Sequence, residues 1–366
     1  MTGDAPDDAA ARAPGSLLAA SPEELRAFVV ARGGQPFHAK VLRRAVVERG
    51  VTDVESITDL PARLRARVAA DLPLFSGRET ARNVARDGTT NLHREFEGRA
   101  RSDDATSPVS VETVHIQPHE RASSDGAARG ATLCVSTQAG CPVGCPFCAS
   151  GLLGLARNLE HDEIVEQFVR GREVGPLSRA VVMGIGEPLL NYENLSRALD
   201  VVRDEIGLGG RRITVSTVGF PERLRRIAPS KPRFQLAISL HTPDQEQRDE
   251  LVPAMRGVPI ESVLEAGDDW FRTTGREVTY EYVLLGGTND APGHADRLVQ
   301  RLRGRRCSVN LIPYNPTRGL PYERPDSGAP EAFRDRLVAG GLVATIRWSR
   351  GLDGAAACGQ LRLQRS

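Results

Sequence analysis

Apolar residues recur every three or four positions between Ser21 and about Leu74, the spacing of helices that bury one face. Ser21 and Glu24 form the pattern of a capping box, in which two side chains bind the amides of the first helical turn. Residues 1–20 lack this spacing and are rich in Ala, Asp, Pro and Gly. The pattern predicts a disordered leader over residues 1–20 and a small all-helical accessory domain over residues 21–87.

The hydrophobic period changes to two between residues 88 and 117. The segments TTNLHREFEG and SVETVHIQP alternate apolar with polar residues on either side of a polar loop. Alternation of this kind is typical of strands with one buried face. We therefore expect a β-hairpin extension and a linker over residues 88–130.

From about residue 131 onward, short apolar runs alternate with amphipathic stretches. The predicted strands are 132–136, 180–183, 213–217, 234–240, 278–285 and 308–313. The predicted helices are 162–174, 195–206, 221–227, 260–273 and 291–303, with a further helix near 330–339 and a strand near 343–348. Repeated strand–helix units predict the α/β class, with a parallel sheet that is either doubly wound or a partial barrel. Residues 131–366 are therefore assigned to a core that ends in a Gly- and Ala-rich tail.

Composition narrows the class of protein. Of 366 residues, 40% are hydrophobic and 26% are charged, which excludes a disordered or fibrous chain. No stretch is apolar for the ~18 residues of a membrane span, and the first residues lack a secretory core, so we expect a soluble, cytoplasmic protein and a monomer. The net charge of +1 neither requires nor excludes a nucleic-acid partner. All but two of the 48 basic residues are arginine, which suits phosphate binding but equally reflects a skewed genome.

Cys141, Cys145 and Cys148 lie in CPVGCPFC directly after the first predicted core strand. The prolines and glycine between them prevent a helix, so three thiolates share one tight loop. Structural zinc wants four protein ligands, whereas an iron–sulfur cubane can be held by three and leave one iron open. The absence of a fourth nearby cysteine favours the cluster over a zinc knuckle or buried thiols. This spacing resembles that of radical S-adenosylmethionine (SAM) enzymes, in which the open iron binds SAM.

Polar residues follow three of the next predicted strands. In the segment VVMGIGEPLLN, the predicted strand ends in Gly184, Gly186 and Glu187, where backbone can approach a ligand and a carboxylate can bind an ammonium group. Ser216 ends the following strand. Ser239 and His241 end the strand after that, although a histidine there is also compatible with a helix cap or a satisfied interior position.

The other three cysteines differ in their surroundings. Cys134 precedes the cysteine loop by seven residues on the first core strand. Cys358 stands in AAACGQL near the end of the chain, where small neighbours favour an accessible thiol over a core position. Cys307, beside a predicted strand, is interpreted as structural.

Taken together, these residues resemble the RlmN/Cfr family of radical SAM adenine methyltransferases that act on RNA. The resemblance runs from Gln35 to Leu361. It rests on QPFHAKVLRRAVVERGVTDVESITDLP, VETVHI, ATLCVSTQAGCPVGCPFCASG, RNL, VVMGIGEPLLN, ITVSTVG, LAISLH, VNLIPYNP and AACGQL. The loop alone marks the superfamily, whereas its combination with two outlying cysteines marks this family.

The resemblance implies a fold and two cofactors. The fold would be a partial (β/α)6 radical SAM barrel with the helical domain and the hairpin attached. Cys141, Cys145 and Cys148 would hold a [4Fe-4S] cluster. The residues implied around SAM are Gly186, Glu187, Ser216, Ser239, Leu240, His241 and Asn315.

The resemblance also implies a radical methyl transfer. Cys358 would carry a methyl group from one SAM, Glu112 would act as general base, and Cys134 would free the product by forming a disulfide with Cys358. The substrate would be C2 or C8 of an adenosine in 23S rRNA at the peptidyl transferase centre, and in some members also tRNA. Electrons would come from a donor such as flavodoxin or ferredoxin. Adenine ring carbons bear no acidic proton, which makes a radical route chemically reasonable.

RNA binding would involve the helical domain, and two other functions stay open. Arginines of that domain could hold the RNA backbone while an unstacked adenine enters the core, although solvated helix faces explain them equally well. The candidates are Arg43, Arg44, Arg63 and Arg65. The alternatives are a radical SAM enzyme with a non-RNA substrate and a metal-stabilised RNA-binding protein without catalysis. The linker PHERASSDGAARG is longer than usual in the family, which affects the substrate surface more than the chemistry.

Overall fold

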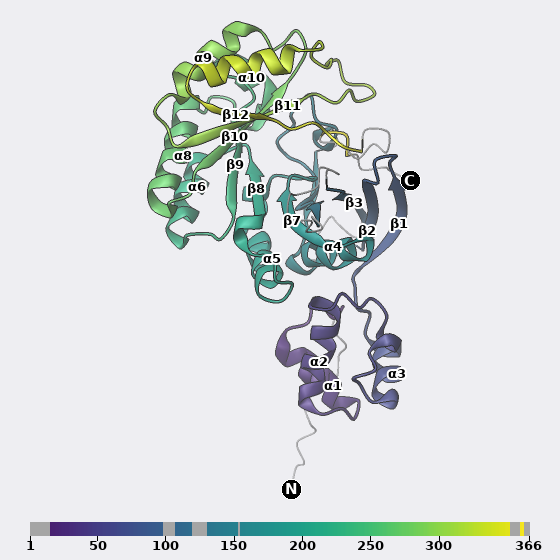
Figure 1. Cartoon of the computed structure of the whole chain (residues 1–366). Helices are drawn as coiled ribbons and strands as arrows, with labels where there is room; N and C mark the ends of the chain where they lie inside the picture. Colours follow the sequence, from purple (N-terminus) through teal and green to yellow (C-terminus); the bar gives the residue numbers. More distant parts are fainter. Residues whose placement is uncertain (1–14, 98–106, 119–129, 153, 352–358, 362–366) are drawn as a thin grey trace, which may run out of the picture.

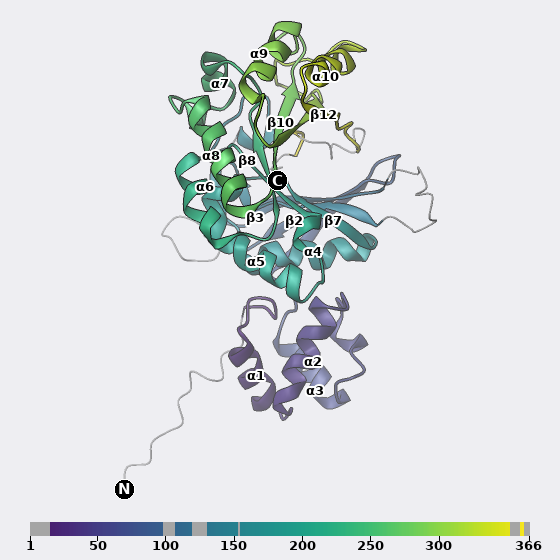
Figure 2. The ribbon, with the colours of Figure 1, turned by 60° about the vertical axis from the view of Figure 1, so that its left-hand side comes forward.

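A computed structural model describes residues 15–97, 107–118, 130–152, 154–351 and 359–361. A small helical domain lies at one end of the molecule, and a large twisted sheet with helices forms the rest (Figures 1 and 2). No helix in these described ranges is long and apolar enough to cross a membrane.

The helical domain contains α1 (Pro22–Ala31), α2 (Pro36–Val47) and α3 (Ala62–Asp71). The predicted capping box is confirmed at α1, where Ser21 Oγ accepts from Glu24 N at 3.1 Å and Glu24 Oε2 accepts from Ser21 N at 2.8 Å. Leu17 and Leu18 are buried in the hydrophobic core, so the predicted leader is wrong over its last residues. Residues 1–14 lie outside the described part of the chain.

One ten-stranded sheet runs in the order β1-β2-β3-β4-β7-β8-β9-β10-β11-β12. Strands β1 to β4 pair antiparallel, and every pair from β4 to β12 is parallel. The bounds are β1 (Gly77–Val84), β2 (Thr90–Phe96), β3 (Val109–Ile116), β4 (Ala131–Cys134), β7 (Leu177–Val182), β8 (Ile213–Thr217), β9 (Gln235–Ser239), β10 (Val278–Leu284), β11 (Cys307–Pro313) and β12 (Val343–Ile346). The predicted hairpin is confirmed as β2–β3.

Sequence reasoning missed β1 and a second, two-stranded sheet. The sequence of β1, GRETARNV, is almost entirely exposed and therefore lacks a buried face to show. The last helix of the helical domain ends at Asp71. The predicted end of this domain, at residue 87, instead falls in the turn between β1 and β2. The small sheet pairs β5 (Gln138–Gly140) with β6 (Leu155–Asn158) around the cysteine loop.

Helices connect the parallel strands and cover the outside of the sheet (Figure 2). They are α4 (His161–Val174), α5 (Tyr192–Asp204), α6 (Pro221–Ile227), α7 (Gln245–Leu251), α8 (Ile260–Thr274), α9 (Pro292–Leu302) and α10 (Ala329–Ala339). The strand–helix succession from β4 to α10 confirms the predicted partial (β/α)6 barrel, with β12 added at one edge.

Two arginines join the helical domain to the core. Arg43 forms a two-point ion pair with Glu205, just after α5, at 2.7 and 2.8 Å. Arg172 on α4 donates to the carbonyl of Glu48 at 3.0 Å. Arg43 is therefore occupied by the protein itself, and two other arginines proposed to hold RNA also form ion pairs, Arg44 with Glu48 and Arg65 with Glu55.

A buried ion pair fixes the hairpin extension to the barrel. Arg94 on β2 and Glu166 on α4 are 1% and 0% exposed, and Arg94 Nη2 donates to Glu166 Oε1 at 2.9 Å. Glu166 Oε2 also accepts the amides of Ser76 and Gly77 at 2.9 and 3.1 Å. Burial, partly offset by the partner charge, lowers the pKa of Arg94 and raises that of Glu166. Each charge therefore depends on the other to remain ionised in this environment.

Removing one partner should leave the other as an uncompensated buried charge. We expect Glu166→Ala to lower the free energy of unfolding by about 3–5 kcal/mol, measured by urea denaturation. The control is Arg78→Ala, which breaks the exposed ion pair with Glu95 and should cost at most about 1 kcal/mol. Equal losses in the two variants would show that the buried pair does not hold the extension in place.

Candidate active site

A cavity opens at the carboxyl ends of the parallel strands, where the barrel architecture predicts a functional site. Its walls come from the cysteine loop, from the segments that follow β7, β8 and β9, and from β10, β11 and the chain end. The lining residues are Cys141, Val143, Cys145, Phe147, Cys148, Met183, Gly184, Gly186, Glu187, Ser216, Thr217, Val218, Ser239, His241, Glu281, Val283, Ile312, Tyr314, Asn315 and Gly359. Ten of the residues predicted from the sequence therefore share one cavity: the three loop cysteines, Gly184, Gly186, Glu187, Ser216, Ser239, His241 and Asn315.

The cysteine loop is closed by backbone hydrogen bonds and by a glycine that tolerates no side chain. Cys141 N donates to Gly154 O, and Cys148 N donates to Cys145 O, both at 3.0 Å. Gly140 has φ +79°, and a Cβ there would lie 2.0 Å from Gly154 O. The loop therefore depends on glycine at this position to bring its cysteines to the cavity.

The three thiols form a mutually interacting set. The pKa of Cys141 is raised to about 12 and that of Cys145 well above its ordinary value, in both cases mainly by burial. The neighbouring thiols contribute to both shifts, because each thiolate disfavours the next. Such a set is ionised together only when a cationic group neutralises it.

The cysteine loop brings three thiols to one cavity. Within the described residues, no group of three or more His, Cys, Asp or Glu side chains is arranged to hold a metal ion. An iron–sulfur cubane can be bound by three cysteine thiolates, one on each of three irons. The number and type of these donors agree with that requirement.

Glu187 joins two strand ends behind the loop. Its buried carboxylate accepts from Leu189 N at 2.9 Å, from Thr217 Oγ1 at 2.5 Å and from Val218 N at 2.9 Å. Burial raises the pKa of Glu187, and these hydrogen bonds oppose that effect. The carboxylate thus organises the cavity wall, a role that the sequence pattern did not indicate.

Gly186, which precedes Glu187, lies at a position of the cavity wall that has no room for a side chain. It has φ +114°, and a Cβ would lie 2.7 Å from Gln138 Cβ and 2.8 Å from Thr137 Oγ1. Only glycine lets the segment after β7 lie this close to the strand that leads into the cysteine loop.

Ser216 and Ser239 lie on neighbouring strands with their hydroxyl oxygens 3.4 Å apart. His241 follows with φ +66°, and its Nδ1 accepts from Val283 N at 3.2 Å. Burial, together with the positive charge of Arg248, lowers the pKa of His241 to about 3, so the ring is neutral and Nε2 carries the proton. Its ring meets Phe147 of the cysteine loop edge-on, with centroids 5.1 Å apart.

The remaining two residues predicted to contact SAM, Leu240 and Asn315, differ from each other in their relation to the cavity. Leu240 has a fully buried side chain that does not line the cavity, and its amide donates to Glu281 O at 3.0 Å. Asn315 lines the cavity and donates from Nδ2 to Ser349 Oγ at 2.7 Å.

Sequence reasoning missed a second buried carboxylate in this cavity. Glu281 lies mid-strand in β10, where it faces Ser239 in register, and Asn310 Nδ2 donates to its Oε2 at 2.7 Å. Burial raises the pKa of Glu281 to about 7. A single charged residue inside a strand of otherwise uncharged, mostly apolar and aromatic residues is the signal that could have identified it.

Glu112 and Cys134 lie next to this cavity rather than in it. Val114 on β3 pairs with Cys134 on β4, and Glu112, two residues before Val114, faces the same side of the sheet. Glu112 is buried, and Asn91 Nδ2 donates to its Oε2 at 2.5 Å. Cys134 packs with Val114 and with Leu361 of the chain end.

The chain end reaches the site from the far edge of the sheet, in yellow in Figure 1. Gly351 N donates to Asp87 Oδ2 at 3.0 Å, in the turn between β1 and β2. Ala149 N donates to Gly359 O at 2.9 Å, and Ser150 Oγ donates to Leu361 O at 3.0 Å. Cys358 lies outside the described residues, and none of the five described cysteines forms a disulfide.

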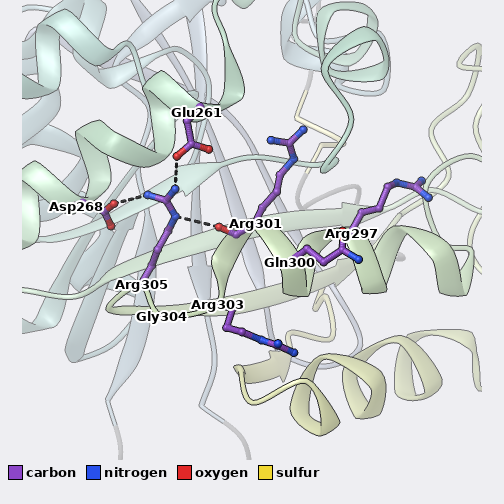
Figure 3. A pocket seen from close by; sticks show the side chains of 8 residues that line it. All are labelled: Glu261, Asp268, Arg297, Gln300, Arg301, Arg303, Gly304 and Arg305. Atoms are coloured by element: carbon purple, nitrogen blue, oxygen red, sulfur yellow. Dashed lines mark hydrogen bonds and ion pairs between the residues drawn. The ribbon is translucent and has the colours of Figure 1, made fainter.

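A second, arginine-rich pocket lies between α8 and α9 (Figure 3). Arg305 is neutralised by Glu261 and Asp268, and Arg297 is paired with Asp244 at 2.7 and 2.8 Å. The side chains of Arg297, Arg301 and Arg303 point in different directions in Figure 3. Their positive charges therefore do not converge on one ligand.

Comparison with known proteins identifies the family. Residues 135–299 match the radical SAM superfamily. A protein of Rhodopirellula baltica named probable dual-specificity RNA methyltransferase RlmN is 43% identical over 95% of this chain and 91% of its own. One of Gloeobacter violaceus with the same name is 44% identical over 94% of each chain. A crystal structure of a radical SAM methyltransferase from Sphaerobacter thermophilus superposes with a TM-score of 0.84 at 38% identity, over 96% of this chain and all of that one. The chain belongs to the RlmN family of radical SAM RNA methyltransferases, which use a [4Fe-4S] cluster and SAM.

Proposed function

We propose that this enzyme methylates C2 or C8 of an adenosine in RNA through a methyl group carried on Cys358. The observation that supports this most directly is the placement of the chain end. Gly359 and Leu361 bind the cysteine loop at Ala149 and Ser150, and Leu361 packs on Cys134. The residues next to Cys358 thus lie between the proposed cluster ligands and the proposed release cysteine.

The cluster ligands would be Cys141, Cys145 and Cys148. Bound there with SAM, the cluster supplies one-electron cleavage that generates a carbon radical. The cavity residues would orient SAM. The neutral His241 offers an N–H donor, Ser216 and Ser239 offer hydroxyls, and Asn315 offers an amide.

Glu112 and Cys134 would complete the reaction on the RNA. The Cys358 methylene radical would first add to the adenine carbon. Glu112, held by Asn91, would then remove the ring proton, and the unpaired electron of the adduct would return to the oxidised cluster, so that a closed-shell thioether would join Cys358 to the base. The Cys134 thiolate would then attack the sulfur of Cys358. The carbon–sulfur bond would break, its electron pair would stay with the carbon and take up a proton, and a Cys134–Cys358 disulfide would remain.

The proposed substrate is 23S rRNA at the peptidyl transferase centre, with tRNA as a second target. The protein would act as a monomer, with flavodoxin or ferredoxin as electron donor. Of the four arginines suggested to bind RNA, only Arg63 is exposed and forms no ion pair among the described residues. RNA binding would therefore also involve other groups of the helical domain.

Mass spectrometry can test the carrier and the product together. With anaerobically reconstituted protein and SAM, we expect one added methyl on the peptide that contains Cys358. With rRNA and a reductant added, nucleoside digestion should yield methyladenosine, whose chromatographic mobility distinguishes the C2 from the C8 isomer. SAM cleavage without a methyl on Cys358 would contradict the carrier, and a methylated carrier with unmodified rRNA and tRNA would point to a non-RNA substrate. Zinc without iron would support the non-catalytic alternative.

A further inference from the structure

A fully buried arginine lies behind the cysteine loop. Arg248 on α7 is 0% exposed, and its Nη2 donates to the carbonyl of Val218 at 2.8 Å. Its Nε and Nη1 have no hydrogen-bond partner among the described residues. A buried guanidinium with two unpaired nitrogens is costly, so it calls for a negative partner.

The groups around Arg248 other than the cysteine loop compensate its positive charge only in part. The amide of Val218 donates to Glu187 and its carbonyl accepts from Arg248, so one residue separates the guanidinium from that carboxylate. Asp249, the next residue on the helix, also interacts with Arg248, but its carboxylate accepts from Gln245 and from the amide of Gly257. His241 is neutral and offers no negative charge.

The cysteine loop is the remaining candidate. The chain after α7 contacts it directly, because Ala254 N donates to Val143 O at 3.2 Å, between two of the cysteines. Val218, whose carbonyl accepts from Arg248, lines the same cavity as Cys145, and the Arg248 and Cys145 side chains interact electrostatically. An arginine guanidinium is charged at neutral pH, so Arg248 places a fixed positive charge behind this part of the loop.

A cluster bound by three thiolates has the charge that this site lacks. Three thiolates outweigh the positive charge of the oxidised iron–sulfur core, and one-electron reduction adds a further negative charge. A fixed positive charge beside one ligand therefore stabilises the reduced cluster more than the oxidised one, because attraction grows with the charge. Net charge and hydrogen bonds at the sulfurs are established determinants of cluster potential.

We propose that Arg248 compensates the negative charge of the cluster on Cys145 and thereby raises its reduction potential. The proposal rests on Cys145 as a cluster ligand. Arg248 is a positioning residue in this role, because its charge acts through Cys145. Its side chain is fully buried and therefore out of reach of the RNA.

The test compares a charge-removing with a charge-keeping substitution. Arg248→Met and Arg248→Lys would be prepared anaerobically, with folding checked by circular dichroism and with iron and sulfide counted per chain. The midpoint potential would be measured without SAM, by a dithionite titration followed by electron paramagnetic resonance. We expect reduction of the Met variant to be at least about tenfold less favourable, a shift of about 59 mV to more negative potential for one electron, while Lys keeps most of the wild-type value.

A matched control lies at the opposite end of the barrel. Arg276, just before β10, also donates to a backbone carbonyl, that of Phe234 at 3.0 Å, and burial also lowers its pKa. Arg276→Met should leave the potential unchanged. If Arg248→Met does not fold, Arg248→Gln replaces it, since glutamine keeps a donor for Val218 without the charge.

The comparison decides the proposal in each case. A Met or Gln variant that loses iron while the Lys variant retains it would support charge compensation, because only lysine keeps the positive charge. Equal potentials and equal iron in Met and Lys would overturn the proposal. An unchanged potential with weaker SAM binding would also overturn it, and would assign the guanidinium to the SAM carboxylate instead.

Discussion

Cys145→Ala is expected to abolish SAM cleavage and methyl transfer together, because the loop would retain only two of the three proposed cluster ligands. The iron content of the anaerobically reconstituted protein should fall to background, and 5'-deoxyadenosine should become undetectable by chromatography. Cys141 and Cys148 would each already bind another iron, so neither could replace Cys145. The loss of activity should be complete rather than graded.

Cys307→Ala is the matched control for this result. Cys307 is a partly buried cysteine at the start of β11, at the amino ends of the strands, and burial raises its pKa to about 11. Its removal should leave iron content and SAM cleavage at the wild-type level. Full iron and normal SAM cleavage in Cys145→Ala would exclude Cys145 as a ligand.

Glu112→Gln should separate radical generation from product formation. Glutamine keeps the shape of the side chain but cannot remove a proton. General acid–base groups contribute roughly 10²–10⁴-fold, and we expect methylated RNA to form slower by about that factor. Cleavage of SAM and methylation of Cys358 should continue, because Glu112 lies outside the cavity lined by the cysteines.

The readout is the ratio of methyladenosine to 5'-deoxyadenosine, both measured by mass spectrometry in one reaction. Glu95→Gln on the neighbouring strand is the control, since Glu95 pairs with exposed Arg78 and should leave the ratio unchanged. A parallel fall of both products in Glu112→Gln would contradict a role as general base and would indicate a structural role for the Asn91–Glu112 contact.

The barrel was predictable because its strands and helices carry clear hydrophobic periods. The cysteine loop was predictable because proline and glycine rule out regular structure between closely spaced cysteines. Strand β1 and helix α7 were not predictable in this way. The residues of β1 are exposed, and α7 spans only seven residues, among which Arg248 resembles an ordinary surface arginine in the sequence.

Some residues of the cavity can be predicted from the local sequence, whereas others depend on how distant segments of the chain pair. Residues at strand ends could be anticipated, because parallel strands bring their carboxyl ends to one edge. Glu281 could not, since its place in the cavity depends on the register of β10 with β9 and β11. The ion pair of Arg43 could not be predicted for a similar reason, because its partner Glu205 lies 162 residues away in the chain.

The sheet does not close on itself, since β1 forms one edge and β12 the other. The chain leaves β12 at Ile346, and Gly351 binds Asp87 beside the opposite edge. Residues 347–351 thus join the two edges of the sheet, which are not paired with each other as strands. An open sheet joined in this way is held at both ends of its strand order, so the turn between β1 and β2 and the end of β12 would keep their relative positions when the cavity fills.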